Sequence, residues 1–225
     1  MTVREEFDAW AEDGRDRGME VRHWHTAKHA LARMAIEPGD RVLDLGCGSG
    51  YAARALAGTA GARAVGLDGS PAMVRNARSY ANDPGLEFLL GDFEQLPFAD
   101  DALDHVFSME AFYYADDPRR ALRELRRVLG SGGSFHCAVN YFVESVHTRD
   151  WQDGIDVPMT RWSTDEYRAA FREAGFHVVA QDTIPDRETE IPPEGAFPTE
   201  GFESREAMVE RYRTFGTLLT VGVVP

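Results

Sequence analysis

The sequence predicts a doubly wound α/β fold with a seven-stranded, mostly parallel sheet. Apolar strand-like runs alternate with helix-like stretches from residue 41 to residue 182. This alternation is typical of βαβ units, whose sheet is covered by helices on both faces. A length of 225 residues suits one well-buried domain. We therefore expect a single domain over residues 1–225.

The first strand, Arg41 to Leu45, runs into a glycine-rich turn and then a helix. Gly46, Gly48 and Gly50 follow the strand at alternate positions. Glycines permit a sharp turn and let a ligand approach the backbone, and a helix begins with free N–H groups. The segment therefore predicts a binding turn of the nucleotide type.

The other elements follow from apolar periodicity and capping residues. Ser70 and Pro71 mark one helix start, and Ser163 with Glu166 forms a capping box at another. Helices are expected at 71–81, 118–129 and 163–174, the second ended by the glycines of 130–133. Strands are expected at 63–68, 86–90, 103–108, 134–139, 176–181 and 214–224.

Two segments interrupt the alternation. Residues 1–37 are aromatic and helical in pattern, which predicts an N-terminal helical lid. Residues 183–213, which include a stretch rich in Pro and Glu, are expected to form an insert or cap. The cofactor-binding core is then 38–182, and 214–225 supplies the last strand. Both irregular segments are placed to cover the site.

The composition is strongly acidic. The formal net charge is −14, and Lys28 is the single lysine among 24 basic residues. An acidic, lysine-poor surface suits concentrated salt, so we expect a halophilic source. The same balance argues against nucleic acid as a partner. The arginines between Arg119 and Arg127 fit the solvated face of a helix rather than a binding patch.

Neither a membrane segment nor a metal centre is predicted. No apolar run reaches membrane-spanning length, and the first residues lack a signal-peptide core, so a cytoplasmic location without a membrane partner is expected. Cys47 and Cys137 form neither a disulfide framework nor a zinc pattern. His25 and His29 are four residues apart, but no nearby Cys or Asp completes a metal shell.

Asp44 indicates which ligand the turn holds. It stands two residues before Gly46, where a carboxylate repels a diphosphate and attracts an ammonium group. Gly50 also comes one residue earlier than the third glycine of a dinucleotide turn. A cationic ligand is favoured over a dinucleotide. A purely structural turn, or a dinucleotide site with unusual spacing, is the alternative.

The pattern D-x-G-x-G-x-G from Asp44 to Gly50 resembles motif I of class I S-adenosylmethionine-dependent methyltransferases. The resemblance extends from Val42 to Val139 and is strongest to the type 11, ubiquinone-biosynthesis-like group of small-molecule enzymes. It implies that Asp68 binds the ribose hydroxyls and Asp92 the adenine amino group. The implied cofactor residues are Asp44, Gly46, Cys47, Gly48, Asp68, Gly69, Ser70, Met73, Asp92, Phe93, Met109 and Glu110.

Several of these residues also have structural interpretations. Asp68 is placed to cap the next helix, Asp92 to stabilise its own turn, and Met73 to fill the core. In the family, the loop that contains Glu110 lies beside the methionine moiety. Glu110 is therefore expected to meet an ammonium group of the cofactor or of the acceptor.

The acceptor site is predicted from aromatic and titratable side chains. Tyr113 and Tyr114 are expected to line it, or else to pack under the lid. His25 and His29 are candidate proton acceptors, needed only if the nucleophile starts protonated. The Asn/Asp-Pro-Pro-Tyr signature of methylases that act on nucleobase or glutamine amino groups is absent.

We interpret the chain as a methyltransferase that uses S-adenosyl-L-methionine on a small-molecule acceptor. A non-catalytic protein that senses the cofactor is the first alternative. A nicotinamide-dependent oxidoreductase is the second, disfavoured by Asp44 and by the glycine spacing. The acceptor molecule and the oligomeric state stay open.

Overall fold

A seven-stranded sheet forms the centre of the computed structural model, which describes residues 1–59, 61–83, 85–199 and 201–225. The strand order is β3-β2-β1-β4-β5-β7-β6, and β7 runs antiparallel to both of its neighbours, β5 and β6. The predicted doubly wound, mostly parallel fold is confirmed. The strands are β1 (Arg41–Leu45), β2 (Arg63–Asp68), β3 (Leu86–Leu90), β4 (Leu103–Met109), β5 (Leu129–Val139), β6 (His177–Ile184) and β7 (Thr217–Val223).

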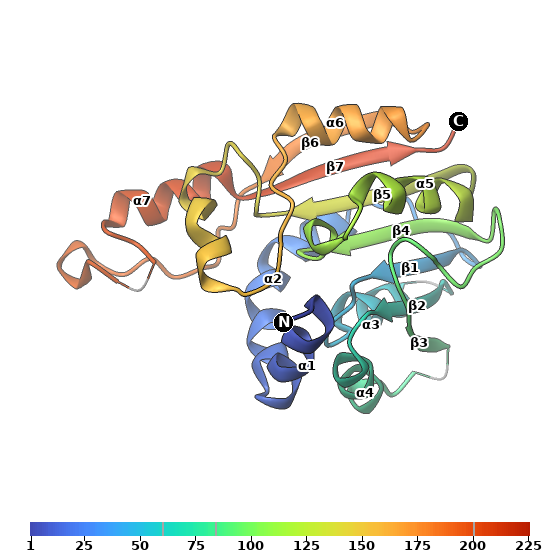
Figure 1. Cartoon of the computed structure of the whole chain (residues 1–225), viewed down its shortest axis with the longest axis horizontal. Coiled ribbons are helices and arrows are strands. Elements are labelled where there is room, and N and C mark those ends of the chain that lie inside the picture. The colour runs from blue at the N-terminus through green and yellow to red at the C-terminus, as the bar shows by residue number, and fades with distance from the viewer. Residues whose placement is uncertain (60, 84, 200) are drawn as a thin grey trace.

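Helices cover both faces of this sheet (Figure 1). One face packs against α5 (Pro118–Val128) and α6 (Thr164–Glu173), and the other against α2 (Arg15–Leu31), α3 (Tyr51–Ala57) and α4 (Pro71–Tyr80). The apolar stripe of α5, which includes Leu122 and Leu125, is fully buried. Burial of each such side chain contributes about 1.5–3 kcal/mol.

Local capping places the helix ends close to their predicted positions. The Ser70 hydroxyl accepts a hydrogen bond from the Met73 N–H at 3.0 Å, and Ser163 and Glu166 form the expected capping box. The predicted start of β5 was wrong by five residues. Its glycines continue the strand because Leu129 pairs with Leu103 and Gly133 accepts from the Val224 N–H at 2.8 Å.

The N-terminal segment forms two helices with different roles. In α1 (Val3–Glu12), the Asp8 carboxylate accepts from the Ser70 hydroxyl at 2.6 Å and the Ala72 N–H at 2.9 Å. Gly14 then turns the chain with a φ of 71°. In α2, Ala27 and Ala30 are buried in the core. The later part of α2 therefore supports the sheet, and α1 with the beginning of α2 stays the candidate for the predicted lid.

The connection between β6 and β7 projects beyond one end of the sheet (Figure 1). It contains η3 (Glu194–Ala196), α7 (Arg205–Val209) and a π-helical segment, η4 (Glu210–Phe215). The Asp186 N–H donates to the Tyr212 carbonyl at 2.8 Å, which anchors the start of the connection to its end. The remaining short helices are η1 (Phe112–Tyr114) and η2 (Val146–Gly154).

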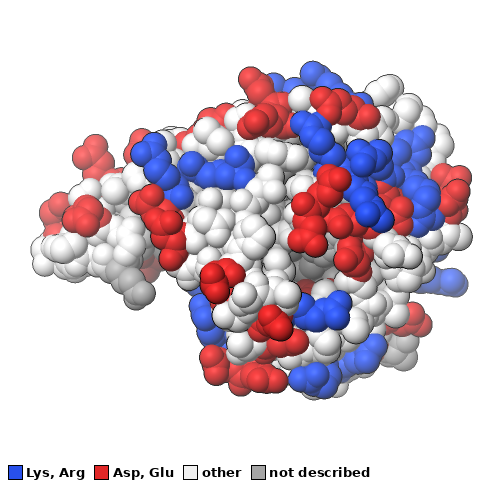
Figure 2. All heavy atoms as spheres, viewed as in Figure 1, with Lys and Arg blue, Asp and Glu red and all other residues white. Residues whose placement is uncertain are grey.

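Acidic and basic side chains are interspersed over the face shown in Figure 2. Arg127 lies 2.7 Å from carboxylate oxygens of both Glu124 and Asp100, and Arg119 pairs with Glu173. The arginines of α5 are thus partly neutralised by ion pairs. Within the described ranges, no helix has the length and apolar character needed to cross a membrane, and no cluster of three metal-ligating side chains occurs.

Candidate functional site

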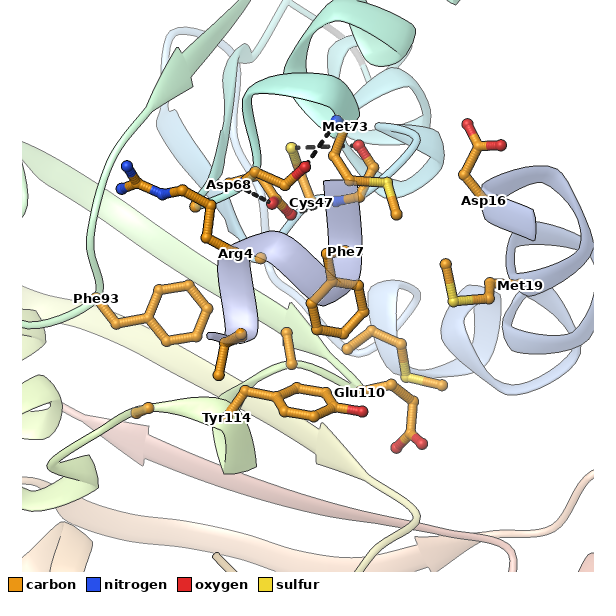
Figure 3. A pocket seen from close by; sticks show the side chains of 18 of the residues that line it. Arg4, Phe7, Asp16, Met19, Cys47, Asp68, Met73, Phe93, Glu110 and Tyr114 are labelled. Atoms are coloured by element: carbon orange, nitrogen blue, oxygen red, sulfur yellow. Dashed lines mark hydrogen bonds between the residues drawn. The ribbon is translucent and has the colours of Figure 1, made fainter. Parts of the chain in front are cut away.

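A cavity of about 620 Å³ opens at the carboxyl ends of β1, β2 and β4 (Figure 3). The start of α1 closes one side of it through Val3, Arg4 and Phe7. Parallel sheets of this type bind ligands at this edge. The sequence-predicted cofactor residues that line the cavity are Gly46, Cys47, Gly48, Asp68, Gly69, Ser70, Met73, Asp92, Phe93, Met109 and Glu110.

The glycine turn requires glycine for different reasons at different positions. Gly46, Gly48 and Gly50 all have positive φ, at 72°, 50° and 77°. A Cβ at Gly46 would stand 2.3 Å from the Ala111 Cβ, and one at Gly50 would overlap the Phe88 ring. A Cβ at Gly48 would meet no atom within 4 Å and would occupy space in the cavity. Gly48 therefore leaves room for a ligand.

Asp68 holds the turn and also faces the cavity. Its carboxylate accepts from the Gly48 N–H at 2.9 Å and from the Ser70 N–H at 2.8 Å. Burial raises its pKa, and these backbone bonds oppose that change. Each carboxylate oxygen can accept more than one hydrogen bond, so Asp68 keeps capacity for a ligand hydroxyl.

Part of the cavity wall is apolar. Figure 3 shows Phe7, Phe93 and Tyr114 presenting their rings to one space, with Met73 above them. Asp92 accepts from the Glu94 N–H at 2.7 Å, so it stabilises its own turn while it lines the cavity. Such a surface suits a flat, uncharged group with a polar edge.

Among the predicted cofactor residues, Asp44 is absent from the cavity wall. It is 2 % exposed, and its carboxylate accepts from the Ala53 N–H at 2.9 Å in the first turn of α3. Burial raises its pKa to about 7. Asp44 therefore supports the helix behind the turn, where acidic groups are favourable.

Glu110 lies at the centre of the site. Its φ is 56°, a left-handed conformation that is uncommon for residues other than glycine. The Glu110 N–H donates to the Ala138 carbonyl at 2.9 Å, and its carboxylate accepts from the Tyr113 hydroxyl at 3.2 Å and from the Asn140 N–H. Burial raises its pKa to about 7.

A second cavity of about 260 Å³ adjoins the first. Its wall comes from segments that are far apart in the sequence. These segments include Asn140 after β5 and Arg211 on η4. The two cavities meet where they share lining residues. The shared residues are Phe7, Met19, His23, Glu110 and Tyr114.

The structure separates the three predicted catalytic residues. Tyr113 lines the second cavity. The His25 Nδ1 instead lies 3.4 Å from an Asp186 carboxylate oxygen and 3.3 Å from the Thr189 hydroxyl, and His25 lines neither cavity. His29 is exposed on α2 and also lines neither.

His23, which the sequence reasoning did not select, lines both cavities. Burial and the neighbouring Arg22 lower its pKa to about 4, so its imidazole is neutral at physiological pH. The residues of α2 that line the larger cavity recur with the spacing i, i+3, i+4 and i+7 of one helix face, and this spacing identifies His23 only once the cavity is known. These residues are Asp16, Met19, Glu20 and His23.

Comparisons with known proteins identify the class. Residues 43–137 match a family model described as a methyltransferase domain, of type 11. In a solved complex of the Haloferax volcanii Trm112 methyltransferase activator with a methyltransferase, the matching chain is 64% identical, with all of both chains covered and a TM-score of 0.96. An S-adenosylmethionine-dependent methyltransferase from Mesorhizobium loti shares the fold, with 22% identity, 87% of this chain and 96% of that chain covered, and a TM-score of 0.69.

Among curated proteins, the sterol 24-C-methyltransferase erg6 of Aspergillus fumigatus is 32% identical over 76% of this chain and 48% of its own length. The chain thus spans about half the length of this relative. It belongs to the class I S-adenosylmethionine-dependent methyltransferases of type 11, as its motifs predicted. Membership of this family implies S-adenosyl-L-methionine as the cofactor.

Proposed function

We propose that the chain transfers the methyl group of S-adenosylmethionine to a small-molecule acceptor. The observation that carries this proposal is the meeting of the two cavities at Glu110 and Tyr114. The larger cavity has room for the cofactor. The smaller one provides a separate site beside it, which a protein that only sensed the cofactor would not need.

The cofactor residues take roles according to the chemistry of their surroundings. Asp68 accepts hydrogen bonds from the ribose hydroxyls, and the apolar part of the wall beside Phe93 holds the adenine, with Asp92 at its amino group. Glu110 attracts the α-ammonium group, since it is the carboxylate shared by both cavities. The sulfonium methyl then points toward the smaller cavity.

Methyl transfer from a sulfonium needs alignment and exclusion of water more than acid–base chemistry. An O–H or N–H nucleophile gains positive charge as it accepts the methyl group, so a weak base suffices to remove its proton. We assign that role to His23, which is neutral and lies at the junction of the cavities. Tyr113, whose hydroxyl donates a hydrogen bond to Glu110, orients the acceptor.

Turnover tests this function directly. The protein is incubated with methyl-labelled S-adenosylmethionine and a small-molecule extract of its source, and both S-adenosylhomocysteine and labelled product are measured. We expect His23→Gln to reduce turnover at least tenfold, while His29→Gln, on the same helix but exposed, retains it. Cofactor binding without formation of either product in any extract fraction would favour the sensor instead.

We further propose a protein partner of the Trm112 activator type. The support is the 64% identity, over the full length of both chains, to the methyltransferase that forms such a complex in Haloferax volcanii. Co-expression with the Trm112-type protein of the same source should yield a complex that stays together in size-exclusion chromatography in molar KCl. Separate elution of the two proteins there would contradict the proposal.

A further inference from the structure

The smaller cavity contains a buried arginine with unused donors. Arg211 lies on η4 and is 4 % exposed. One Nη donates to the Gly216 carbonyl at 2.9 Å, and within the described ranges this is the single hydrogen bond of the guanidinium. A guanidinium has five N–H groups, so most of its donors have no protein partner. Arg211 lines the cavity, which is where those donors are free to act.

Nearby carboxylates do not neutralise Arg211 by direct contact. The Asp186 carboxylate accepts from the N–H groups of Glu188 and Thr189, at 2.8 and 2.9 Å, and Glu110 accepts from Tyr113 and Asn140. Among the described residues, neither acid comes within ion-pair distance of Arg211. A buried cation without a direct partner is costly, and an anionic ligand would remove that cost.

The other residues of the smaller cavity indicate the shape of an anionic ligand. The Arg211 guanidinium carbon lies 5.5 Å from the Trp151 ring centre and 5.4 Å from that of Tyr212. Asn140 uses its side-chain oxygen to accept from the Thr217 hydroxyl at 2.7 Å, and its NH₂ group faces Glu110, which leaves one N–H as a further donor. Aromatic walls of this kind favour a flat ligand. The aromatic residues that line the cavity are Phe7, Trp10, Tyr113, Tyr114, Trp151 and Tyr212.

We propose that the methyl acceptor is a small monocarboxylate with a flat, apolar body, and that Arg211 binds its carboxylate. The inference rests on the proposed function and names its substrate class. Arginine matches a carboxylate with two parallel hydrogen bonds. A single negative charge fits better than a phosphate dianion, because Glu110 and Asp186 would repel the second charge. The nucleophile of the acceptor then lies at the Glu110–Tyr114 junction.

Binding to the protein saturated with S-adenosylhomocysteine tests this proposal. The probes are benzoate, 4-hydroxybenzoate and indole-3-acetate, each paired with its carboxamide, and phenyl phosphate as the dianion. Dissociation constants are measured by ligand-observed NMR at one salt concentration. We expect at least one acid to bind roughly 10- to 100-fold more tightly than its amide. Arg211→Gln should abolish this preference.

Arg205→Gln is the matched control, because Arg205 belongs to the same connection between β6 and β7 but is exposed and lines neither cavity. Equal binding of all acids and amides to the wild-type protein would overturn the inference, as would a preference that survives Arg211→Gln. Tighter binding of phenyl phosphate than of every acid would overturn the monocarboxylate assignment. If Arg211→Gln does not fold, the comparison of acids with their amides on the wild-type protein still tests the proposal.

The same samples separate this inference from the proposed function. S-adenosylhomocysteine affinity is measured by calorimetry before each titration. Failure of the wild-type protein to bind it would count against the methyltransferase function itself. Normal binding without a preference for acids would count only against the acceptor class.

Discussion

Cofactor affinity should increase with pH between pH 5.5 and 7.0, and Glu110 should be the cause. Burial raises the pKa of this carboxyl to about 7 in the free protein. The ionised form attracts the cofactor ammonium, whereas the protonated form does not, so binding favours ionisation and releases a proton. About 3 % of Glu110 is ionised at pH 5.5 and about half at pH 7.0, which gives at most a ~16-fold rise in affinity.

Calorimetry with S-adenosylhomocysteine at several pH values measures this rise. The range ends at pH 7.0 because α-amino groups themselves titrate near pH 7.7–8.0. Repeating the titration in two buffers of different ionisation enthalpy counts the proton released. His23 does not interfere strongly, since burial lowers its pKa to about 4.

Two variants test whether Glu110 causes the pH dependence of cofactor affinity. Glu110→Gln should flatten the pH profile. Asp44→Asn is the matched control, because burial raises the pKa of Asp44 to about 7 as well, yet Asp44 lies outside the cavity wall. A profile that stays steep in Glu110→Gln and becomes flat in Asp44→Asn would refute the assignment and restore Asp44 as the partner of the ammonium. A flat wild-type profile would refute the electrostatic reasoning altogether.

Three other predictions follow from the same contacts. Asp68→Asn should weaken S-adenosylhomocysteine binding by about 1.5–3 kcal/mol and also lower the melting temperature, since Gly48 and Ser70 both lose a charged acceptor and one of them then faces an NH₂ group. Unchanged affinity would leave Asp68 a structural role only. Asp8→Ala should speed cofactor release in stopped-flow experiments, because it removes the hydrogen bonds that hold α1 to the start of α4. Glu12→Ala, at the exposed end of α1, should leave the release rate unchanged. Equal release rates for the two variants would contradict the lid. Finally, with 38 acidic against 24 basic residues, the melting temperature should rise from low to molar KCl as repulsion is screened, and a constant value would argue against salt adaptation.

The sequence by itself determined the local features of this protein. The bounds of β2 and β3, the caps at Ser70 and Ser163 and the glycine turn depend on neighbouring residues, so periodicity and turn chemistry predict them. The cofactor cavity was predictable for a related reason. Residues that follow parallel strands collect at one edge of the sheet, and the larger cavity opens at the edge where the motif after β1 predicted a ligand.

Tertiary structure decided what depends on contacts between distant residues. β7 lies between β5 and β6 because Ser134 pairs with Val223 and Gln181 with Thr220, and no local pattern specifies such pairs. The sequence placed Asp44 at the ligand, but packing turned it toward α3. In the sequence, Arg211 was one arginine of the predicted insert or cap, and no role was assigned to it. It became a buried cation beside Glu110 only when the connection between β6 and β7 folded back over the site, because burial and long-range charge are properties of the assembled chain.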